Sequence, residues 1–303
     1  PEILFQSGNY HIRIHLFAHS PVTWDSSQPR MFSTFKSAAV LALLAVASAD
    51  GIFNVFEESV CIANQAQAAR CLNDAHPIKY QLAQAVARVR LGKFYLTGWL
   101  WGSEGHLVTN HHNIPNERVA NKARVEFGSE CSTCADPSND DKGGCVGTFV
   151  ADSTTLVFTD KLLDVSLLKL NLNPGVNLTQ YGYLQARAAN ASLDEEVYLL
   201  GHPFGKPKQI TFEHDDGTHA RITSTSTPSI CREQDTLGYN LDTESGSSGS
   251  PVLGARDNKV VALHNCWGCH LNGKNTGNKM TKIVALLRSQ NLLPKDAVAD
   301  DHC

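Results

Sequence analysis

A serine-rich turn in the last third of the chain has the residue types that nucleophilic catalysis needs. It covers residues 242–252, and its core reads G-x-S-G-S-P-V, with Gly246 first and Ser248 third. A serine becomes a nucleophile only when a base removes its proton and donors stabilise the oxyanion that its attack creates. Because Gly246 has no Cβ, the backbone can turn so that its N–H and that of Ser248 point at one spot. Taken alone, the stretch fits an ordinary surface turn before a strand equally well.

Two upstream segments contain the other groups that such a serine requires. The motif Thr109-Asn110-His111-His112 ends a predicted hairpin strand, where an imidazole can project into a cleft. Asp164 stands at the head of an apolar strand, where a carboxylate is costly to bury unless a group such as a histidine N–H donates to it. The chain order is therefore His, Asp, Ser, whereas α/β-hydrolases have Ser, Asp, His and a G-x-S-x-G motif. This order disfavours the α/β-hydrolase fold.

The predicted elements that position these groups are short strands at regular spacing. Many short strands with a single helix at the end are typical of two antiparallel barrels or sandwiches. The predicted strands cover residues 94–101, 106–110, 123–127, 147–151, 154–158, 164–170, 196–200, 208–212, 220–223, 239–242, 250–253 and 259–264, and the predicted helix covers 281–293.

The three segments together resemble the catalytic segments of chymotrypsin-fold (trypsin-like) serine peptidases. T-N-x-H and G-x-S-G-S-P-V are closest to the glutamyl-endopeptidase-related branch, and the likeness covers about residues 85–290. It implies an all-β fold of two antiparallel six-stranded β-barrels with a C-terminal helix. It also implies a serine endopeptidase in which His112 is the general base, Asp164 orients it and Ser248 attacks, while the N–H groups of Gly246 and Ser248 hold the oxyanion. His111 is the competing base, but neighbours on a strand face opposite sides and the motif selects His112.

The side chain preferred before the scissile bond depends on which residue lies at the base of the substrate pocket. Ungapped counting back from Ser248 places Asp242 there, which favours Arg or Lys, and we expect this weakly basic preference. One residue later, Thr243 together with His264 would instead favour an acidic side chain. The resemblance further implies that residues 265–268, which include Cys266, Trp267 and Gly268, pair with the substrate backbone as an added strand.

Composition excludes several other classes of function. The chain has 303 residues, is 42% hydrophobic and has a net charge of −4, so it can bury a sizeable core and has no basic face for nucleic acid. Residues 31–49 have the positive charge, short apolar run and Ala47-Ser48-Ala49 site of a secretory signal. We therefore expect a secreted protein with no membrane association after signal removal.

The expected organisation follows from these features. Residues 1–30 are an upstream segment that we do not expect in the natural protein, 31–49 the signal peptide, and 50–84 an N-terminal extension or a propeptide, two options that the sequence does not separate. Residues 85–185 form the first barrel and 186–303 the second barrel with the helix and tail. The resemblance implies protein or peptide substrates, protein inhibitors as partners, and chemistry without a cofactor or metal. A secreted binding protein on the same fold, without catalysis, is the alternative.

Nine cysteines follow the signal and are disulfide candidates in an oxidising compartment. Cys61 and Cys71 are close enough to staple a short loop, and the odd count leaves Cys303 as the unpaired thiol. Two C-x-x-C pairs, at 131–134 and 266–269, also fit a zinc site, although secretion favours disulfides. Sequons at Asn177 and Asn190 are candidate glycosylation sites.

Overall fold

The computed structural model describes residues 3–7, 10–14, 58–231, 235–269 and 273–299. The chain divides into two compact units, Pro1–Ala49 and Asp50–Cys303. In the first unit, β1 (Ile3–Ser7) and β2 (Tyr10–Ile14) form an antiparallel hairpin in which Ile3 pairs with Ile14. The predicted signal peptide at 31–49 lies outside the described residues. Among those that are described, no helix has the length and apolar character needed to cross a membrane.

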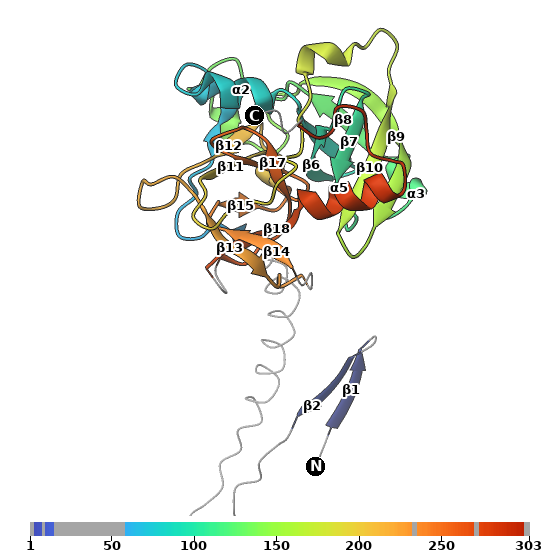
Figure 1. Cartoon of the computed structure of the whole chain (residues 1–303), viewed down its shortest axis with the longest axis vertical. Helices are drawn as coiled ribbons and strands as arrows, with labels where there is room; N and C mark the ends of the chain where they lie inside the picture. Colours follow the sequence, from blue (N-terminus) through green and yellow to red (C-terminus); the bar gives the residue numbers. More distant parts are fainter. Residues whose placement is uncertain (1–2, 8–9, 15–57, 232–234, 270–272, 300–303) are drawn as a thin grey trace, which may run out of the picture. The chain divides into compact units, whose positions relative to one another are not determined.

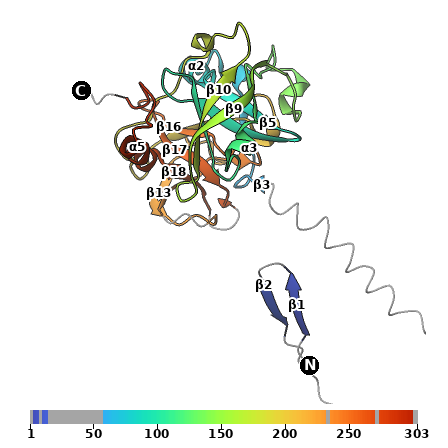
Figure 2. The same ribbon diagram turned by 90° about the vertical axis from the view of Figure 1, so that its right-hand side faces the viewer.

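The second unit contains a closed barrel of six antiparallel strands in the order β10-β7-β6-β5-β8-β9. Its interior is filled by apolar side chains that alternate along the strands, including the buried Leu100, Leu107 and Phe127, which the strand register places on one face. Figures 1 and 2 show this barrel beside a second sheet. The barrel strands are β5 (Val86–Leu91), β6 (Phe94–Leu100), β7 (His106–Thr109), β8 (Arg124–Phe127), β9 (Thr148–Asp160) and β10 (Val165–Leu172).

The second sheet has eight strands in the order β13-β14-β18-β17-β16-β11-β12-β4. A mostly β fold with a six-stranded barrel, a second β unit and a C-terminal helix is therefore confirmed. The second sheet has more than the six strands predicted, partly because β4, from the N-terminal extension, pairs with β12 at the edge of the sheet. The strands are β4 (Gln67–Ala68), β11 (Val197–Gly201), β12 (Gln209–Thr211), β13 (Ile222–Thr227), β14 (Thr236–Tyr239), β16 (Pro251–Gly254), β17 (Val260–Cys266) and β18 (Asn275–Lys279).

In the part of the chain that the structure describes, helices are few and short. The longest, α5 (Met280–Ser289), buries Met280, Ile283 and Leu287 and lies beside β17 and β18 (Figure 1). These three residues are spaced as expected for one face of an amphipathic helix. The other helices are η2 (Ala69–Leu72), α2 (Pro77–Ala83), α3 (Glu117–Ala120), η3 (Pro137–Asp140), η4 (Leu178–Tyr181) and η5 (Pro203–Gly205).

The extension contains a segment, residues 58–68, that we call the strap. Its first strand, β3 (Glu58–Ser59), pairs with β15 (Thr243–Glu244) in a separate two-stranded sheet. The strap ends with β4. Cys61 is bonded to Cys269, and Cys71, just beyond the strap, is bonded to Cys134. The predicted staple between Cys61 and Cys71 is therefore wrong, because each of them links the extension to a distant part of the fold.

A buried ion pair connects the barrel to the turns around it. Arg88 and Glu126, each 1% exposed, face each other across β5 and β8, with Nη2 to Oε1 at 2.9 Å. Arg88 Nη1 also donates to the carbonyls of Gly144 and Gly205, and Glu126 accepts from the Gly147 N–H. The two charges are paired with each other, and Arg88 Nη1 has two carbonyl acceptors. The two side chains therefore hold the turns at Gly144–Gly147 and at Gly205 against the barrel.

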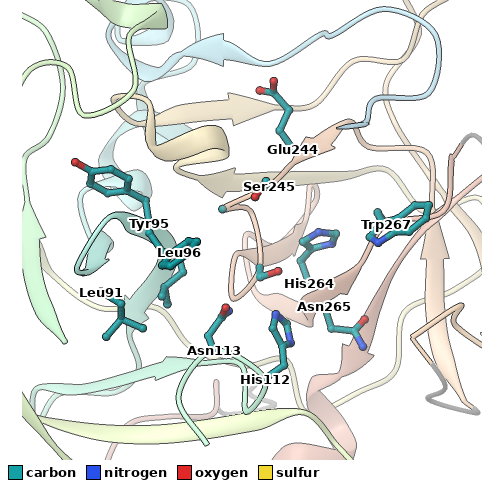
Figure 3. Close-up of a pocket in the computed structure, with 13 residues that line it drawn as sticks. Leu91, Tyr95, Leu96, His112, Asn113, Glu244, Ser245, His264, Asn265 and Trp267 are labelled. Carbon is teal, nitrogen blue, oxygen red and sulfur yellow. The ribbon is translucent and has the colours of Figure 1, made fainter. Parts of the chain in front are cut away.

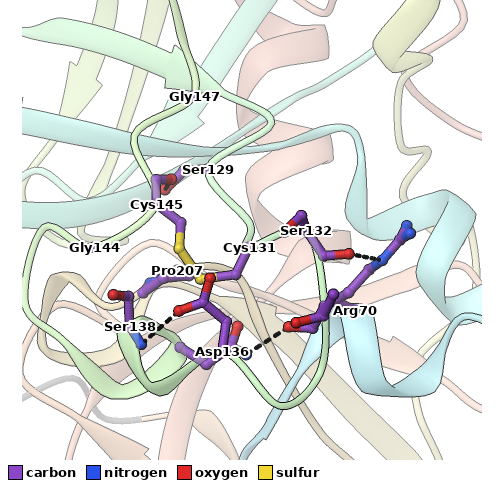
Figure 4. Close-up of a disulfide and its surroundings, with 12 residues drawn as sticks. Arg70, Ser129, Cys131, Ser132, Asp136, Ser138, Gly144, Cys145, Gly147 and Pro207 are labelled. Carbon is purple, nitrogen blue, oxygen red and sulfur yellow. Dashed lines mark hydrogen bonds between the residues drawn. A yellow bond between two sulfur atoms is a disulfide. The ribbon is translucent and has the colours of Figure 1, made fainter.

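The polar insertion at 131–145 is fixed by disulfides. Cys131 is bonded to Cys145, as Figure 4 shows, and Asp136 caps η3 by accepting from the Ser138 N–H. Arg70 donates to the Ser132 carbonyl at 3.1 Å and so joins the insertion to η2. The thiols of both predicted C-x-x-C pairs are therefore used in disulfides and do not form the zinc site considered from the sequence.

Candidate active site

The predicted base and carboxylate are in direct contact. His112 Nδ1 lies 2.7 Å from Asp164 Oδ2, and the His112 backbone N–H donates to Asp164 Oδ1 at 2.8 Å. The Asp164 carbonyl accepts from Asn110 Nδ2. Asp164 has a φ of 44°, a left-handed conformation that an aspartate tolerates better than most residues. Both carboxylate oxygens are thus committed to one histidine, whose other ring nitrogen is left for a different partner.

His111 is turned to a different partner. Its Nδ1 lies 2.8 Å from Thr159 Oγ1, and the two share a hydrogen bond. Both histidines lie in a turn that follows β7, so the alternation expected along a strand does not separate them. What distinguishes His112 is its pair of hydrogen bonds with Asp164.

Ser248 lies in a tight loop between β15 and β16. Gly246 has a φ of 94° and Gly249 a φ of 90°, and a Cβ at Gly249 would meet the Thr97 carbonyl oxygen at 2.1 Å. Both positions therefore require glycine. The Thr97 N–H donates to the Ser248 carbonyl at 3.1 Å, so the first barrel directly supports the serine.

The Ser245–Gly246 peptide bond is oriented by a neighbouring turn. The Phe204 N–H donates to the Ser245 carbonyl. Because the C=O and N–H of a trans peptide point in opposite directions, the Gly246 N–H is turned away from Phe204. Among the described residues, neither the Gly246 nor the Ser248 N–H donates to another protein group. Both donors are therefore available to a ligand.

A cavity of about 360 Å³ brings the candidate residues together. Ser248, His112 and Gly246 line it, with His264 on the side of the second sheet. Figure 3 shows the rings of His112 and His264 at one end and Tyr95 at the other, with Glu244 and Ser245 across from the histidines. The remaining lining residues are Leu91, Phe94, Leu96, Asn113, Asn265 and Trp267.

A second cavity of about 670 Å³ also contains the serine and the histidine. Its lining includes Leu162, which is 83% exposed, together with Trp267. The two cavities thus extend from Ser248 in two directions, as a cleft that holds an extended chain requires.

The structure does not bring Asp242 to the cleft. The side chain is buried, and its two oxygens accept hydrogen bonds from the backbone N–H groups of Cys61 (2.8 Å) and Gln65 (2.9 Å) of the strap. Burial raises the pKa of this carboxyl, and the two backbone donors oppose the shift. Thr243 is also buried and pairs with Ser59, and neither residue lines either cavity.

His264 does line the cavity beside Ser248. Its Nδ1 lies 2.7 Å from the Tyr239 hydroxyl. Burial, with a smaller contribution from His112, lowers the pKa of His264 to about 3, so the ring is neutral at physiological pH. The wall of the cavity therefore carries a neutral imidazole.

The segment at 265–268 contains the last two residues of the buried strand β17 and the two residues after it. Cys266 is bonded to Cys231 and Cys269 to Cys61, so the two cysteines are not bonded to each other. Trp267 lines both cavities, and the Gly268 N–H donates to Asn275 Oδ1. The edge is therefore stiffened by two disulfides from different parts of the chain.

Two features of the cavity were not foreseen from the sequence, although Asn265 itself belongs to the edge at 265–268 that was predicted to pair with substrate. Asn265 Nδ2 is buried without a hydrogen-bond partner among the described residues, next to the cavity. Glu244 lines the same cavity, with its carboxylate held by Lys206 (3.1 Å) and Asn64 (3.1 Å). The only sequence signal for these residues was their closeness to the serine motif and to His264.

The two sequons lie outside the cleft, and both asparagines are exposed. Asn177 Oδ1 accepts from the N–H and the hydroxyl of Thr179, and Asn190 Oδ1 accepts from the Thr281 hydroxyl. Their glycosylation stays a prediction.

Known proteins resemble this chain in both sequence and fold. It is 37% identical over 248 residues to "Secreted RxLR effector protein 73" of Plasmopara viticola, covering 80% of the chain and 59% of that protein. It is 27% identical over 162 residues to "Protease Do-like 5, chloroplastic" of Arabidopsis thaliana, covering 52% of the chain and 43% of that protein. The chain thus spans between two fifths and three fifths of the length of these relatives.

A solved structure shows the same fold. The inactive form of the protease Rv3671c matches with a TM-score of 0.51 at 19% identity, over 75% of this chain and 98% of that one. A family model described as "Trypsin-like peptidase domain" matches residues 96–263, more than half of the chain. The glutamyl-endopeptidase branch is not distinguished by any of these matches. The chain therefore belongs to the trypsin-like peptidase domain family.

Proposed function

We propose that the protein is a secreted serine endopeptidase with the triad His112, Asp164 and Ser248. The observation that carries this proposal is the 2.7 Å contact between His112 Nδ1 and Asp164 Oδ2, with Ser248 on the wall of the same cavity. The four disulfides agree with an oxidising compartment, and one relative is named a secreted protein.

The proposed reaction proceeds through an acyl-enzyme. His112 Nε2 takes the proton of Ser248 Oγ as the oxygen attacks the scissile carbonyl, and Asp164 holds the ring in the tautomer that can accept it. The N–H groups of Gly246 and Ser248 donate to the oxyanion. His112 then gives its proton to the leaving amine, and water, activated by the same ring, hydrolyses the ester.

For the residue before the scissile bond, we propose a side chain that accepts hydrogen bonds, Glu or Gln. The weak expectation of Arg or Lys depended on Asp242, whose carboxylate is instead occupied by Cys61 and Gln65. The cavity is lined by the neutral ring of His264, which is hydrogen-bonded to Tyr239, and by Asn265, whose Nδ2 has no hydrogen-bond partner among the described residues. A site built from such donors discriminates strongly against side chains that leave them unpaired.

A fluorophosphonate probe tests the triad. We expect wild type to label and Ser248→Ala to remain unlabelled, because the probe reacts only with an activated serine. Ser250→Ala is the matched control and should label at close to the wild-type rate, since Ser250 is fully buried and lines neither cavity. Equal labelling of wild type and Ser248→Ala would exclude Ser248 as the nucleophile.

A peptide library tests the specificity. We expect cleavage after Glu or Gln to exceed cleavage after Lys or Arg, and His264→Ala to reduce this preference. A clear preference for Arg or Lys would contradict the proposed pocket.

A non-catalytic binding protein remains the second candidate because one relative is named an effector, a word that specifies no reaction. A folded, purified wild-type protein that neither labels nor cleaves any library peptide would favour it.

A further inference from the structure

The strap contacts the loop of the nucleophile at its beginning. Residues 243–244 form β15, and β3 of the strap is the one strand that pairs with it in the described part of the chain, with Ser59 opposite Thr243. Asn64 Nδ2 donates to Glu244 Oε2 at 3.1 Å. The next residues along the chain, Ser245 and Gly246, line the cavity of the proposed active site.

The strap also reaches the opposite wall. The disulfide between Cys61 and Cys269 ties it to the residue that follows the edge at 265–268. Asn265 and Trp267 of that edge line the same cavity as Ser248. One segment of the extension is therefore linked to two of the chain segments that line the pocket, the one at 244–248 and the one at 264–267.

Asp242 holds this segment in place. Its carboxylate accepts from two strap N–H groups four residues apart, at 2.8 Å and 2.9 Å. The strap residues between these two N–H groups therefore form a loop that the Asp242 carboxylate closes. Backbone N–H groups paired to a charged acceptor form stronger hydrogen bonds than those to a neutral one. Asp242 immediately precedes β15, so the residue that holds the strap is only six positions from Ser248.

We propose that Asp242 is a positioning residue for the proposed peptidase reaction: it holds the strap against β15, and the strap fixes Ser245 and Gly246 in the geometry that binds substrate. This inference rests on the proposed function. Under this proposal the active enzyme contains the strap. Residues 58–68 are then a retained extension and not a propeptide that is removed.

The energetics of the site separate this role from a purely structural one. Burial raises the pKa of Asp242, which means that the folded state holds the charged carboxylate less easily than water does. Removing the charge should therefore cost little global stability, whereas removing the two hydrogen bonds should release the loop. A loss of activity larger than the loss of global stability accounts for is the expected signature.

The test compares Asp242→Ala and Asp242→Asn with wild type. Asp257→Asn is the matched control, because this partly buried carboxylate also accepts hydrogen bonds on both oxygens, two from Arg187 and one from the Lys259 N–H, and lines neither cavity of the cleft. For Asp242→Ala we expect kcat/KM on a peptide substrate to fall by about tenfold, a loss comparable to that of one charged hydrogen bond. Asp242→Asn keeps one acceptor and should recover part of this loss, while the control should stay within twofold.

Hydrogen exchange provides a readout that does not need activity. Amides of residues 243–249 should exchange faster in Asp242→Ala than in wild type, and those of the barrel strands should not. If Asp242→Ala does not fold, Asn64→Ala removes the bond between the strap and Glu244 and should show the same pattern with a smaller change.

The outcomes separate the two proposals. Unchanged exchange at 243–249, or an active wild type with unchanged kcat/KM in Asp242→Ala, would overturn the positioning role. Faster exchange in a protein whose wild type neither labels nor cleaves would reject the peptidase, and with it the role of Asp242 in catalysis, while supporting the hold of Asp242 on the loop at 243–249.

Discussion

At the scale of single residues, the cleft combines groups that burial has made neutral with groups whose charges are paired. His264 and Tyr239 share a hydrogen bond in the interior, and burial lowers the pKa of the first and raises that of the second well above 10. Glu244 lies on the same cavity and has Lys206 as its ion-pair partner. The wall therefore presents donors and acceptors rather than an unpaired charge.

The low pKa of His264 predicts a loss of stability in acid. The unfolded ring binds a proton near pH 6.5, whereas the folded ring does so near pH 3. The unfolded state therefore binds more protons in this interval, and the free energy of unfolding falls as the pH falls. Between pH 6.5 and 4.5 this one group should account for about 2 kcal/mol.

Urea denaturation of wild type and His264→Gln at both pH values measures this contribution. The variant lacks the titrating ring, so its stability should fall by less over the same interval. Parallel pH profiles for the two proteins would show that His264 is not the titrating group.

Single residues also show where sequence reasoning ends. The structure brings the predicted histidine and aspartate into contact and places the predicted serine on the wall of the same cavity, because motif and chain order are enough to locate these candidates. The partners of Asp242 could not be foreseen, because they are backbone groups nearly two hundred positions earlier in the chain, whose side chains have no role in the bond.

At the scale of elements, the buried pair of Arg88 and Glu126 supports the loop of the serine through a short series of contacts. Arg88 donates to the Gly205 carbonyl, and the preceding N–H, that of Phe204, donates to the Ser245 carbonyl. The first barrel thus helps to orient the peptide of the proposed oxyanion donor.

Replacing Arg88 should destabilise the protein strongly. Arg88→Met leaves the Glu126 charge buried without its partner, and we expect a loss of about 3–5 kcal/mol in the free energy of unfolding. The control Arg124→Met breaks an exposed pair with Asp152 and should cost less than about 1 kcal/mol. Chemical denaturation measures both losses. Equal losses in the two variants would mean that the buried ion pair contributes no more to the free energy of unfolding than the exposed one.

The elements that the sequence predicted are those with alternating apolar residues. The predicted strands at 147–151 and 154–158 are one strand, β9, which continues through the polar residues between them because one of its faces is exposed. β18 was missed because its sequence, NTGNK, is polar, although Asn275 and Asn278 are buried and donate to the Leu241 and Leu163 carbonyls. Hydrogen bonds take the place of apolar contacts there, and hydropathy does not reveal them.

At the scale of the whole molecule, the extension links the six-stranded barrel to the second sheet. Beyond the strap, Cys71 is bonded to Cys134 of the insertion that follows β8 of the barrel. Cys61 is bonded to Cys269, just after β17 of the second sheet. The sequence predicted disulfides from the count of cysteines and the signal, but pairing is decided by distances in the fold, which spacing does not give.

Removal of one such link should cost stability but little activity. The bond between Cys71 and Cys134 spans 63 positions, and closing a loop of that length is expected to stabilise by about 4 kcal/mol. The double variant Cys71→Ala/Cys134→Ala should lose about that much in chemical denaturation, with kcat/KM within twofold because neither residue lines the cleft. A kcat/KM reduced as much as in Asp242→Ala would show that this link also holds the active site.

The two disulfides of the extension have a consequence for fragmentation of the chain. A cut at any single peptide bond between Cys61 and Cys71, such as one beside the 81% exposed Ile62, leaves each new end covalently attached to the body. The nicked protein would run as one species without reductant and as two with it. Self-digestion or attack by another protease at this exposed site would therefore not release the N-terminal piece.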